Sequence, residues 1–265
     1  MNIEISIWYF FIYASIGYLI EVVYCSLGER KLVNRGFLHG PYLPIYGFGA
    51  FFIVALFGES EHTPFVIFLI SVLITSAVEY VSSYLLEILF HTRLWDYSNY
   101  RFHLRGRICL LNSILFGLLG LALIFLIHPL VAFAVFRLPK KVLMYGAVLF
   151  LVLIAIDTIV SVYRLSAFQK QLSEFKQRMQ NWEHRLTLIS SLTPSKKVSQ
   201  LKELIGLEIE EFKLRLDSSA KRFLAVFPSM SSKDSEKQRL LNQLRQRARQ
   251  RREKLTKRLH KTKKD

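Results

Sequence analysis

Long apolar runs follow one another through the first 163 residues of the chain, and only short polar stretches separate them. Five runs reach or approach the roughly 20 apolar residues that a helix needs to cross about 30 Å of hydrocarbon. They cover approximately residues 5–27, 41–57, 64–90, 108–127 and 142–163. The second run is short and rich in proline and glycine, so a re-entrant segment is the alternative to a span there. The pattern predicts an all-α, polytopic membrane helix bundle with about five transmembrane helices.

A stretch near the end of the first run recurs near the end of the third. The two copies, each with one carboxylate in an apolar setting, are Tyr18-Leu-Ile-Glu21-Val-Val-Tyr24 and Tyr84-Leu-Leu-Glu87-Ile-Leu-Phe90. Arg35-Gly36 and Ile45-Tyr46-Gly47 follow the first copy, and Arg105-Gly106 and Leu115-Phe116-Gly117 follow the second. We interpret this as a core of two duplicated helical hairpins. Chance similarity between Leu- and Ile-rich helices is the alternative.

Beyond residue 163 the apolar positions take up a heptad spacing. They are Leu165, Phe168, Leu172, Phe175, Met179, Trp182, Leu186 and Ile189 in a first stripe and Leu201, Ile205, Ile209, Phe212, Leu216, Ala220, Phe223 and Phe227 in a second. Such steps of three and four residues are typical of helices that pack through one face. A break at Pro194 separates the stripes. Residues 164–227 are therefore predicted to form an antiparallel helical hairpin or one half of a dimeric coiled coil, which would make a homo-oligomer.

Positive charge is concentrated at the end of the chain. Residues 164–265 hold 26 of the 36 Lys and Arg residues and 11 of the 20 Asp and Glu residues, so nearly all of the formal net charge of +16 lies there. We divide the chain into a transmembrane domain (1–163), the helical hairpin or coiled coil (164–227) and a basic tail (228–265). Anionic lipid headgroups would attract such a tail. Nucleic acid is the other polyanion that would, and a merely solvated tail is the third possibility.

Lys and Arg near the ends of the apolar runs predict the orientation, because cytoplasmic loops carry an excess of them. Residues 28–40 hold three such residues and residues 91–107 hold four, whereas residues 58–63 hold none. Together with the basic tail, this predicts a multi-pass protein of the plasma membrane with its N-terminus outside and its C-terminus in the cytoplasm. One loop disagrees, since Arg137, Lys140 and Lys141 would then lie outside.

This topology places the acidic residues of the apolar runs near the cytoplasmic side, level with the basic loops. An ionisable side chain inside a membrane is costly, so it faces protein or water and marks a candidate working site. The candidates for a substrate or ion pathway are Glu21, Arg35, His39, Glu79, Glu87, Asp96, Arg105, Arg107 and Asp157. Thr75, Glu79, Ser83 and Glu87 recur at every fourth residue and form a polar stripe. We expect a polar cavity open to the cytoplasm, with ion pairs that only hold helices together as the alternative.

Other kinds of chemistry find little support in the sequence. No close-spaced ligand pair such as CxxC or HExxH is present, so neither a metal nor another cofactor is expected. Asp96, Ser98 and His103 supply the atoms of a nucleophilic set, but their spacing matches no signature. The sequence also contains no GxxxxGK(S/T) phosphate loop, so the chain does not hydrolyse ATP through a Walker-type site.

Several blocks of the sequence are similar to a known family. The blocks are Gly17-Tyr-Leu-Ile-Glu21-Val, Val33-Asn-Arg-Gly-Phe-Leu-His-Gly-Pro41-Tyr-Leu-Pro-Ile-Tyr-Gly47-Phe-Gly49, Glu79-Tyr, Ser83-Tyr-Leu-Leu-Glu87, Trp95-Asp-Tyr-Ser98 and Gly106-Arg-Ile-Cys-Leu110. They cover about residues 13–130 and resemble the bacterial ABC-transporter type IV, or CmpB-like, membrane proteins. The resemblance implies an integral membrane permease component that borrows a separate ATPase subunit. It does not supply a substrate.

The leading hypothesis is therefore a permease-like transporter component in the lipid bilayer whose candidate residues line a cavity facing the cytoplasm. One alternative is an enzyme that acts on a lipid or isoprenoid-phosphate headgroup with the same carboxylates and arginines. Another is an insertase- or scaffold-like protein whose basic tail recruits ribosomes or other partners.

Overall fold

The computed structural model describes residues 2–29, 36–58 and 62–190, and beyond them residues 212, 222–224, 226–227, 229–232, 238 and 242. Its contacts divide the chain into two compact units, which are described separately. Unit 1 consists of Met1–Leu89 and Arg93–Tyr163, and unit 2 consists of Phe90–Thr92 and Arg164–Asp265.

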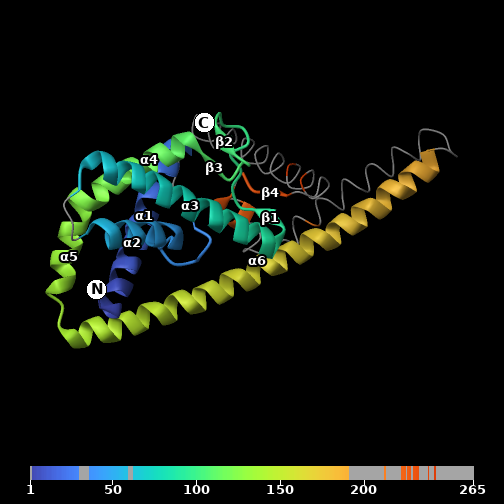
Figure 1. The fold of residues 1–265 in the computed structure, drawn as a ribbon. Helices are drawn as coiled ribbons and strands as arrows, with labels where there is room; N and C mark the ends of the chain where they lie inside the picture. Colours follow the sequence, from blue (N-terminus) through green and yellow to red (C-terminus); the bar gives the residue numbers. More distant parts are fainter. Residues whose placement is uncertain are drawn as a thin grey trace, which may run out of the picture. The chain divides into compact units, whose positions relative to one another are not determined.

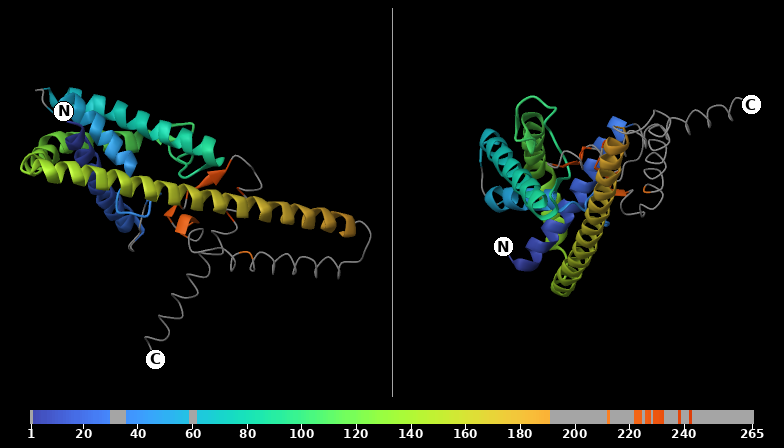
Figure 2. Two further views of the ribbon diagram at one scale, coloured as in Figure 1. Left: turned by 90° about the horizontal axis from the view of Figure 1, so that it is seen from below. Right: turned by 90° about the vertical axis from the view of Figure 1, so that its right-hand side faces the viewer.

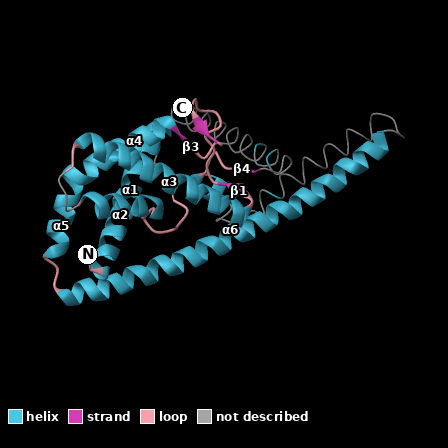
Figure 3. Ribbon diagram, in the orientation of Figure 1, coloured by secondary structure: helices cyan, strands magenta, loops and turns pink. Residues whose placement is uncertain are grey.

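Nearly all of the described regular structure is helical (Figures 1 and 3). The helices are α1 (Ile3–Glu29), α2 (Pro44–Phe57), α3 (Pro64–Phe90), α4 (Leu110–Ala122), the π-helical η1 (Leu123–Ile127), α5 (His128–Phe136) and α6 (Lys140–Ser190). Prolines stand at several helix beginnings: Pro44 and Pro64 open α2 and α3, and Pro139 directly precedes α6. Proline fits there because the first N–H groups of a helix have no partner within it.

Four stretches of the described helices are long and apolar enough to cross a membrane. They are Ile3–Leu27, Pro64–Phe90, Leu110–Phe136 and Lys140–Asn181. Helix α2 is also apolar but has 14 residues, or about 21 Å of helix, which is shorter than the hydrocarbon core. The predicted all-α membrane helix bundle is confirmed. The fifth span, which depends on α2, remains a prediction.

The third of these stretches changes its winding in the middle. Helix α4 continues through η1 into α5, and the backbone N–H of His128 donates to the carbonyl of Leu123, five residues back. Pro129 follows immediately. It has no N–H to donate and its ring crowds the carbonyl four residues earlier, so a regular α-helical turn cannot form there. The wider π turn accommodates the proline without ending the helix.

Close packing between helices in unit 1 depends on glycine. A Cβ at Gly17 of α1 would overlap the side chain of Tyr46 on α2, and a Cβ at Gly120 of α4 would overlap Ser71 on α3. Helices α3 and α4 accordingly lie side by side (Figures 1 and 2). Small residues at such contacts let helix backbones approach, which is how helices associate where no water drives them together.

The two sequence repeats meet in unit 1. The first repeat covers α1 and α2, and the second covers α3 and α4. Tyr46 and Phe116 occupy equivalent positions in the two repeats, and their rings contact each other edge to face with centroids 5.7 Å apart. Corresponding residues of the two sequence copies are thus in contact, and the duplication of the hairpins remains a prediction.

Short strands make up the remaining regular structure of the described residues. They are β1 (Thr92–Arg93), β2 (His103–Leu104), β3 (Ile108–Cys109) and β4 (Ser231–Ser232). Strands β2 and β3 pair antiparallel, with His103 opposite Cys109 and Leu104 opposite Ile108. This hairpin closes the loop between α3 and α4.

Unit 2 buries the first half of the predicted heptad stripe. Leu165, Phe168, Leu172 and Phe175 are buried. The ring of Phe168 stacks on Phe223 with centroids 6.3 Å apart, and the ring of Phe175 stacks on Phe212 at 3.9 Å. These contacts run in antiparallel order along the chain, as the hairpin prediction requires. Most of the second stripe and of the basic tail lies outside the described residues, so the coiled coil and the tail remain predictions.

Replacing Gly120 by alanine tests the packing of α3 against α4. The new methyl group would overlap the Cβ and Oγ atoms of Ser71, and overpacking of this kind costs about 1–3 kcal/mol. Gly49→Ala is the matched control, because its Cβ would lie 3.6 Å from Thr75, an ordinary contact. We expect G120A to lower the apparent melting temperature in detergent by at least about 2 °C relative to G49A. Equal melting temperatures would contradict the packing described here.

Candidate functional site

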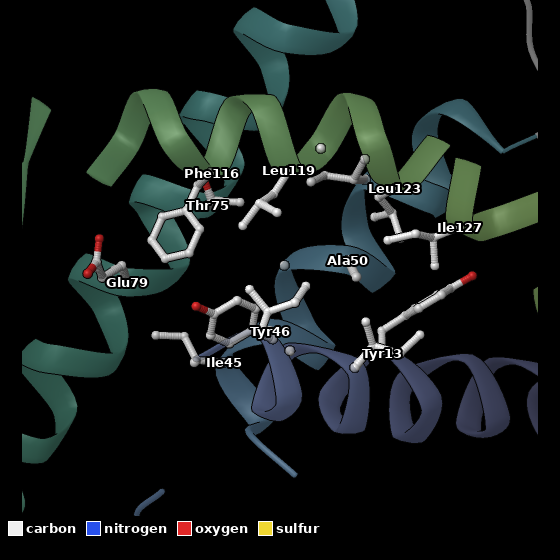
Figure 4. Close-up of a pocket in the computed structure, with 16 residues that line it drawn as sticks. Tyr13, Ile45, Tyr46, Ala50, Thr75, Glu79, Phe116, Leu119, Leu123 and Ile127 are labelled. Carbon is white, nitrogen blue, oxygen red and sulfur yellow. The ribbon is translucent and has the colours of Figure 1, made fainter. Parts of the chain in front are cut away.

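A cavity lies between α1, α2, α3 and the α4–η1 helix of unit 1 (Figure 4). It holds about 680 Å³ of empty space, part of it open to the surroundings. Most of the lining is apolar and comes from side chains such as Ile16, Ile53, Leu119 and Leu123. Among the described residues that form the lining, Glu79 is the only one with a charged side chain. The cavity is therefore an apolar chamber with one carboxylate in its wall.

Glu79 and Tyr13 lie at opposite ends of the cavity, and the polar residues Tyr46 and Thr75 lie between them. Figure 4 shows Glu79 at one end and Tyr13 near Ile127 at the other. Tyr13 Oη and His128 Nδ1 are hydrogen-bonded at 2.7 Å. Between the ends lie Ala50 and Leu119. A ligand in the chamber would thus have a carboxylate at one end, hydrocarbon along its middle and a phenol at the other end.

Two carboxylates and two phenols come together at the Glu79 end. Tyr97 Oη donates to Glu79 Oε1 (3.0 Å), and Tyr46 Oη donates to Glu21 Oε2 (2.8 Å). The Cys25 thiol donates to the other oxygen of Glu21 (3.3 Å). We call Glu21, Tyr46, Glu79 and Tyr97 the carboxylate–tyrosine cluster. Among the described residues, the ion pairs of unit 1 involve neither Glu21 nor Glu79.

Tyr97 lies in the loop between α3 and α4, and a tight turn reverses the direction of the chain within this loop. Arg105 and Gly106 have φ of 52° and 70°, and the N–H of Arg107 donates to the carbonyl of Leu104 (3.0 Å). Two successive left-handed residues closed in this way make a type I′ turn, the kind that joins paired strands. The repeated Arg-Gly pair at 105–106 is therefore a turn in the second hairpin.

The Trp-Asp-Tyr-Ser block packs against this turn. The backbone N–H of Tyr97 donates to the carbonyl of Gly106 (2.8 Å), and the indole N–H of Trp95 donates to the carbonyl of Arg107 (3.1 Å). A Cβ on Gly106 would come within 2.6 Å of Asp96 Oδ1, so only glycine fits there. Burial and the nearby Glu79 raise the pKa of Tyr97. Its phenol therefore stays protonated at neutral pH and keeps its proton to donate.

Glu87 lies in a separate cluster near the end of α3. Its Oε2 accepts from Arg93 Nε (2.9 Å) and from Arg107 Nη2 (2.5 Å). The guanidinium of Arg107 also lies over the rings of Tyr80 and Tyr84, 5.4 Å and 5.1 Å from their centroids. The Glu87 and Arg107 side chains are only 6% and 5% exposed. This is a neutralised, buried ion pair of the kind that fixes a loop to a helix end.

Asp157 of α6 holds the loop that follows α1. Its carboxylate accepts the backbone N–H groups of His39 (2.9 Å) and Gly40 (2.8 Å) and the hydroxyl of Tyr42 (2.8 Å). His39 Nδ1 also lies 3.0 Å from Ser161 Oγ. Burial and the bond to Asp157 raise the pKa of Tyr42, so the phenol remains a donor. Two backbone donors and a phenol satisfy this carboxylate without a Lys or Arg.

The structure thus distributes the predicted site residues over several places. Glu79 lines the cavity, and Glu21 lies beside it in the carboxylate–tyrosine cluster. Glu87 and Arg107 form the buried ion pair, and His39 and Asp157 form the loop anchor. Asp96 accepts from the backbone and hydroxyl of Ser98 within its own loop, and Arg105 is exposed. Arg35 lies outside the described residues.

Sequence reasoning missed the tyrosines as site residues. Tyr46 and Tyr97 lie in sequence blocks that resemble the family, and that similarity was the available signal. Tyr13 carries no motif. Among the described residues, no group of three or more His, Cys, Asp or Glu side chains is placed to hold a metal ion. Cys25 and Cys109 are both buried thiols that are not joined in a disulfide.

Removing the Glu87 charge tests the ion pair. Glu87→Gln leaves the buried guanidinium of Arg107 and the partly exposed one of Arg93 without a neutralising carboxylate, and breaking a buried pair in this way costs roughly 3–5 kcal/mol. We expect E87Q to reduce the yield of monodisperse protein on size-exclusion chromatography and to lower its melting temperature. Arg105→Gln, in the same loop but exposed, should leave both unchanged. Equal behaviour of the two variants would show that the pair contributes little.

Removing the Asp157 carboxylate tests the loop anchor. Asp157→Ala deprives the amides of His39 and Gly40 of their acceptor, so hydrogen–deuterium exchange over residues 36–43 should become about tenfold faster or more. Ser161→Ala is the control, because it removes a hydroxyl from the same cluster but leaves the acceptor of both amides in place. Unchanged exchange in D157A would contradict the anchor.

Comparison with known proteins agrees with the sequence motifs. A family model described as "Putative ABC-transporter type IV" matches residues 8–162, more than half of the 265-residue chain. Neither the curated proteins nor the solved structures that were compared gave a match. The family match spans the cavity, the carboxylate–tyrosine cluster and the loop anchor. The chain therefore belongs to this ABC-transporter-type family and is a multi-pass membrane protein.

Proposed function

We propose that this protein is the permease-like component of a transporter and that the cavity between α1 and the α4–η1 helix is its substrate site. The observation that carries the proposal is the cavity itself, a chamber inside the helix bundle whose apolar wall contains the buried Glu79. Ligand sites are usually apolar concavities with a few well-placed polar groups. An ionisable residue within a membrane helix most often marks a substrate or ion path.

The local helix geometry supports a binding role for this chamber. Leu123 and Ile127 of the π turn both line the cavity, and π turns inside α-helices occur frequently at functional sites. Helix α2 contributes Tyr46, Gly49 and Ala50 to the same wall. Its 14 residues end within the hydrocarbon thickness, as in transporters whose short or broken helices surround a substrate near the membrane midplane.

The proposal includes a partner and an orientation. The sequence has no phosphate loop, so a transporter of this type would draw its energy from a separate ATPase subunit. The proposed location is the plasma membrane. The arginines of the loop between α3 and α4 favour a cytoplasmic position for that loop. The Glu79 end of the cavity would then be the cytoplasmic end, because Tyr97 of the same loop contacts Glu79.

The lipid-headgroup enzyme has less support from the geometry. Such an enzyme would need positive side chains beside its carboxylates to hold a phosphate. Arg93 and Arg107 are instead paired with Glu87, and no arginine lines the cavity. The apolar lining favours a binding and transport role over phosphate chemistry.

Filling the chamber tests the proposal. Ala50→Trp places an indole in the middle of the cavity, whereas Ala134→Trp makes the same change at an exposed position of α5. We expect native mass spectrometry of protein purified from its own membrane to show a small molecule bound to the wild type and to A134W, and to show it depleted in A50W. An ATPase subunit should co-purify with all three. Equal occupancy of A50W and A134W would overturn the assignment of the cavity.

A further inference from the structure

We infer that the cavity takes an organic cation with an apolar body, an alkylammonium-type molecule whose positive headgroup lies against Glu79. The inference deepens the proposed function and rests on it, because it names the substrate class of the same chamber. Three features of the described residues carry it: the charge at one end of the cavity, the incomplete bonding of Glu79, and the nature of the remaining wall.

The first feature is an excess of negative charge. Glu21 and Glu79 lie in one cluster with two tyrosines, and the hydrogen bonds that the cluster shows come from neutral donors, two phenols and a thiol. Two arginines of the neighbouring loop, Arg93 and Arg107, pair with Glu87 and not with the carboxylates of this cluster. A membrane protein normally pairs its buried charges. Among the described residues this cluster has carboxylates without cations.

The second feature is an oxygen of the Glu79 carboxylate that accepts no hydrogen bond from the described residues. The residue is 4% exposed, and its Oε2 has no hydrogen-bond partner among the described residues. A buried carboxylate oxygen without a partner costs several kcal/mol, so native proteins rarely keep one except where something binds. Glu79 lines the cavity, so a ligand in the chamber can supply the missing partner.

The third feature is the wall beyond Glu79, which identifies the kind of cation. Tyr46 and Phe116 form an aromatic pair beside the carboxylate, and aromatic rings attract ammonium groups. Ala50, Leu119 and Leu123 continue the wall as hydrocarbon. An inorganic ion such as Ca²⁺ would need six or more oxygen ligands, which this wall does not offer. The lining fits a positive head with a carbon chain.

A pair of probes that differ only in headgroup tests the charge requirement on the wild-type protein. Octylammonium and octanesulfonate carry the same eight-carbon chain, one with a positive head that can donate hydrogen bonds and one with a negative head. Equilibrium dialysis of the full chain in a nonionic detergent, with labelled probes, gives saturable binding above partition into micelles. We expect the ammonium probe to bind at least about tenfold more tightly than the sulfonate, as for a charge-assisted contact.

Matched variants then test whether Glu79 is the residue that binds the positive headgroup. Glu79→Gln should weaken binding of the ammonium probe about tenfold or more while leaving the weak sulfonate binding unchanged. Glu4→Gln makes the same substitution at the beginning of α1, outside the cavity lining, and should leave both affinities unchanged. Equal affinity of the wild type for the two probes would overturn the inference, and so would displacement of the ammonium probe by NaCl or MgCl₂ to the same extent in wild type and E79Q.

The A50W variant separates this inference from the proposed function. If A50W blocks both probes but the wild type does not distinguish them, the chamber binds amphiphiles without selecting charge. The substrate class is then wrong and the transport site stands. If A50W leaves the binding of both probes unchanged, the chamber is not the binding site and both proposals fail.

Discussion

Every charged group in the membrane part of this protein must be satisfied by its immediate neighbours, because hydrocarbon offers no hydrogen bonds. The structure meets this constraint in three different ways. Glu87 receives two arginines, and Asp157 receives two backbone N–H groups and a phenol. Glu21 and Glu79 receive phenols. The first two arrangements hold loops to helices, whereas the third leaves an oxygen of Glu79 without a hydrogen-bond partner in the cavity wall. The candidate site is thus the place where a buried carboxylate borders the cavity.

The same constraint explains why the loop between α3 and α4 is so regular. Its type I′ turn brings Arg107 to Glu87 and sets Tyr97 against Glu79, so one loop contacts both carboxylates of the α3 stripe. Gly106 is essential to this arrangement, because its left-handed φ of 70° and its contact with Asp96 exclude a side chain. The loop therefore links the structural ion pair to the candidate site.

Much of the architecture was predictable because it follows from one-dimensional patterns. Apolar length predicted the spanning helices, and the heptad spacing predicted that Phe168 and Phe175 would be buried. The four-residue step predicted that Glu79 and Glu87 would share a polar stripe on the third apolar helix. Which arginine pairs with Glu87 was not predictable, because the pairing depends on the geometry of the loop. Arg105 and Arg107 are two residues apart, yet the turn exposes the first and buries the second. The π turn at Pro129 and the tyrosine donors likewise depend on packing that no periodicity encodes.

The two repeats bond their equivalent carboxylates in different ways. Glu21 and Glu87 are equivalent in sequence, and Tyr46 is equivalent to Phe116. In the first repeat Tyr46 has a hydroxyl that bonds to Glu21. In the second repeat Phe116 has none, so Glu87 cannot be satisfied in the same way, and the arginines of the following loop neutralise it instead. Phe116 in turn presents a purely apolar ring to the cavity. The carboxylate of the first repeat is thus bonded by a phenol beside the cavity, whereas the equivalent carboxylate of the second repeat is bonded by arginines and holds a loop to α3.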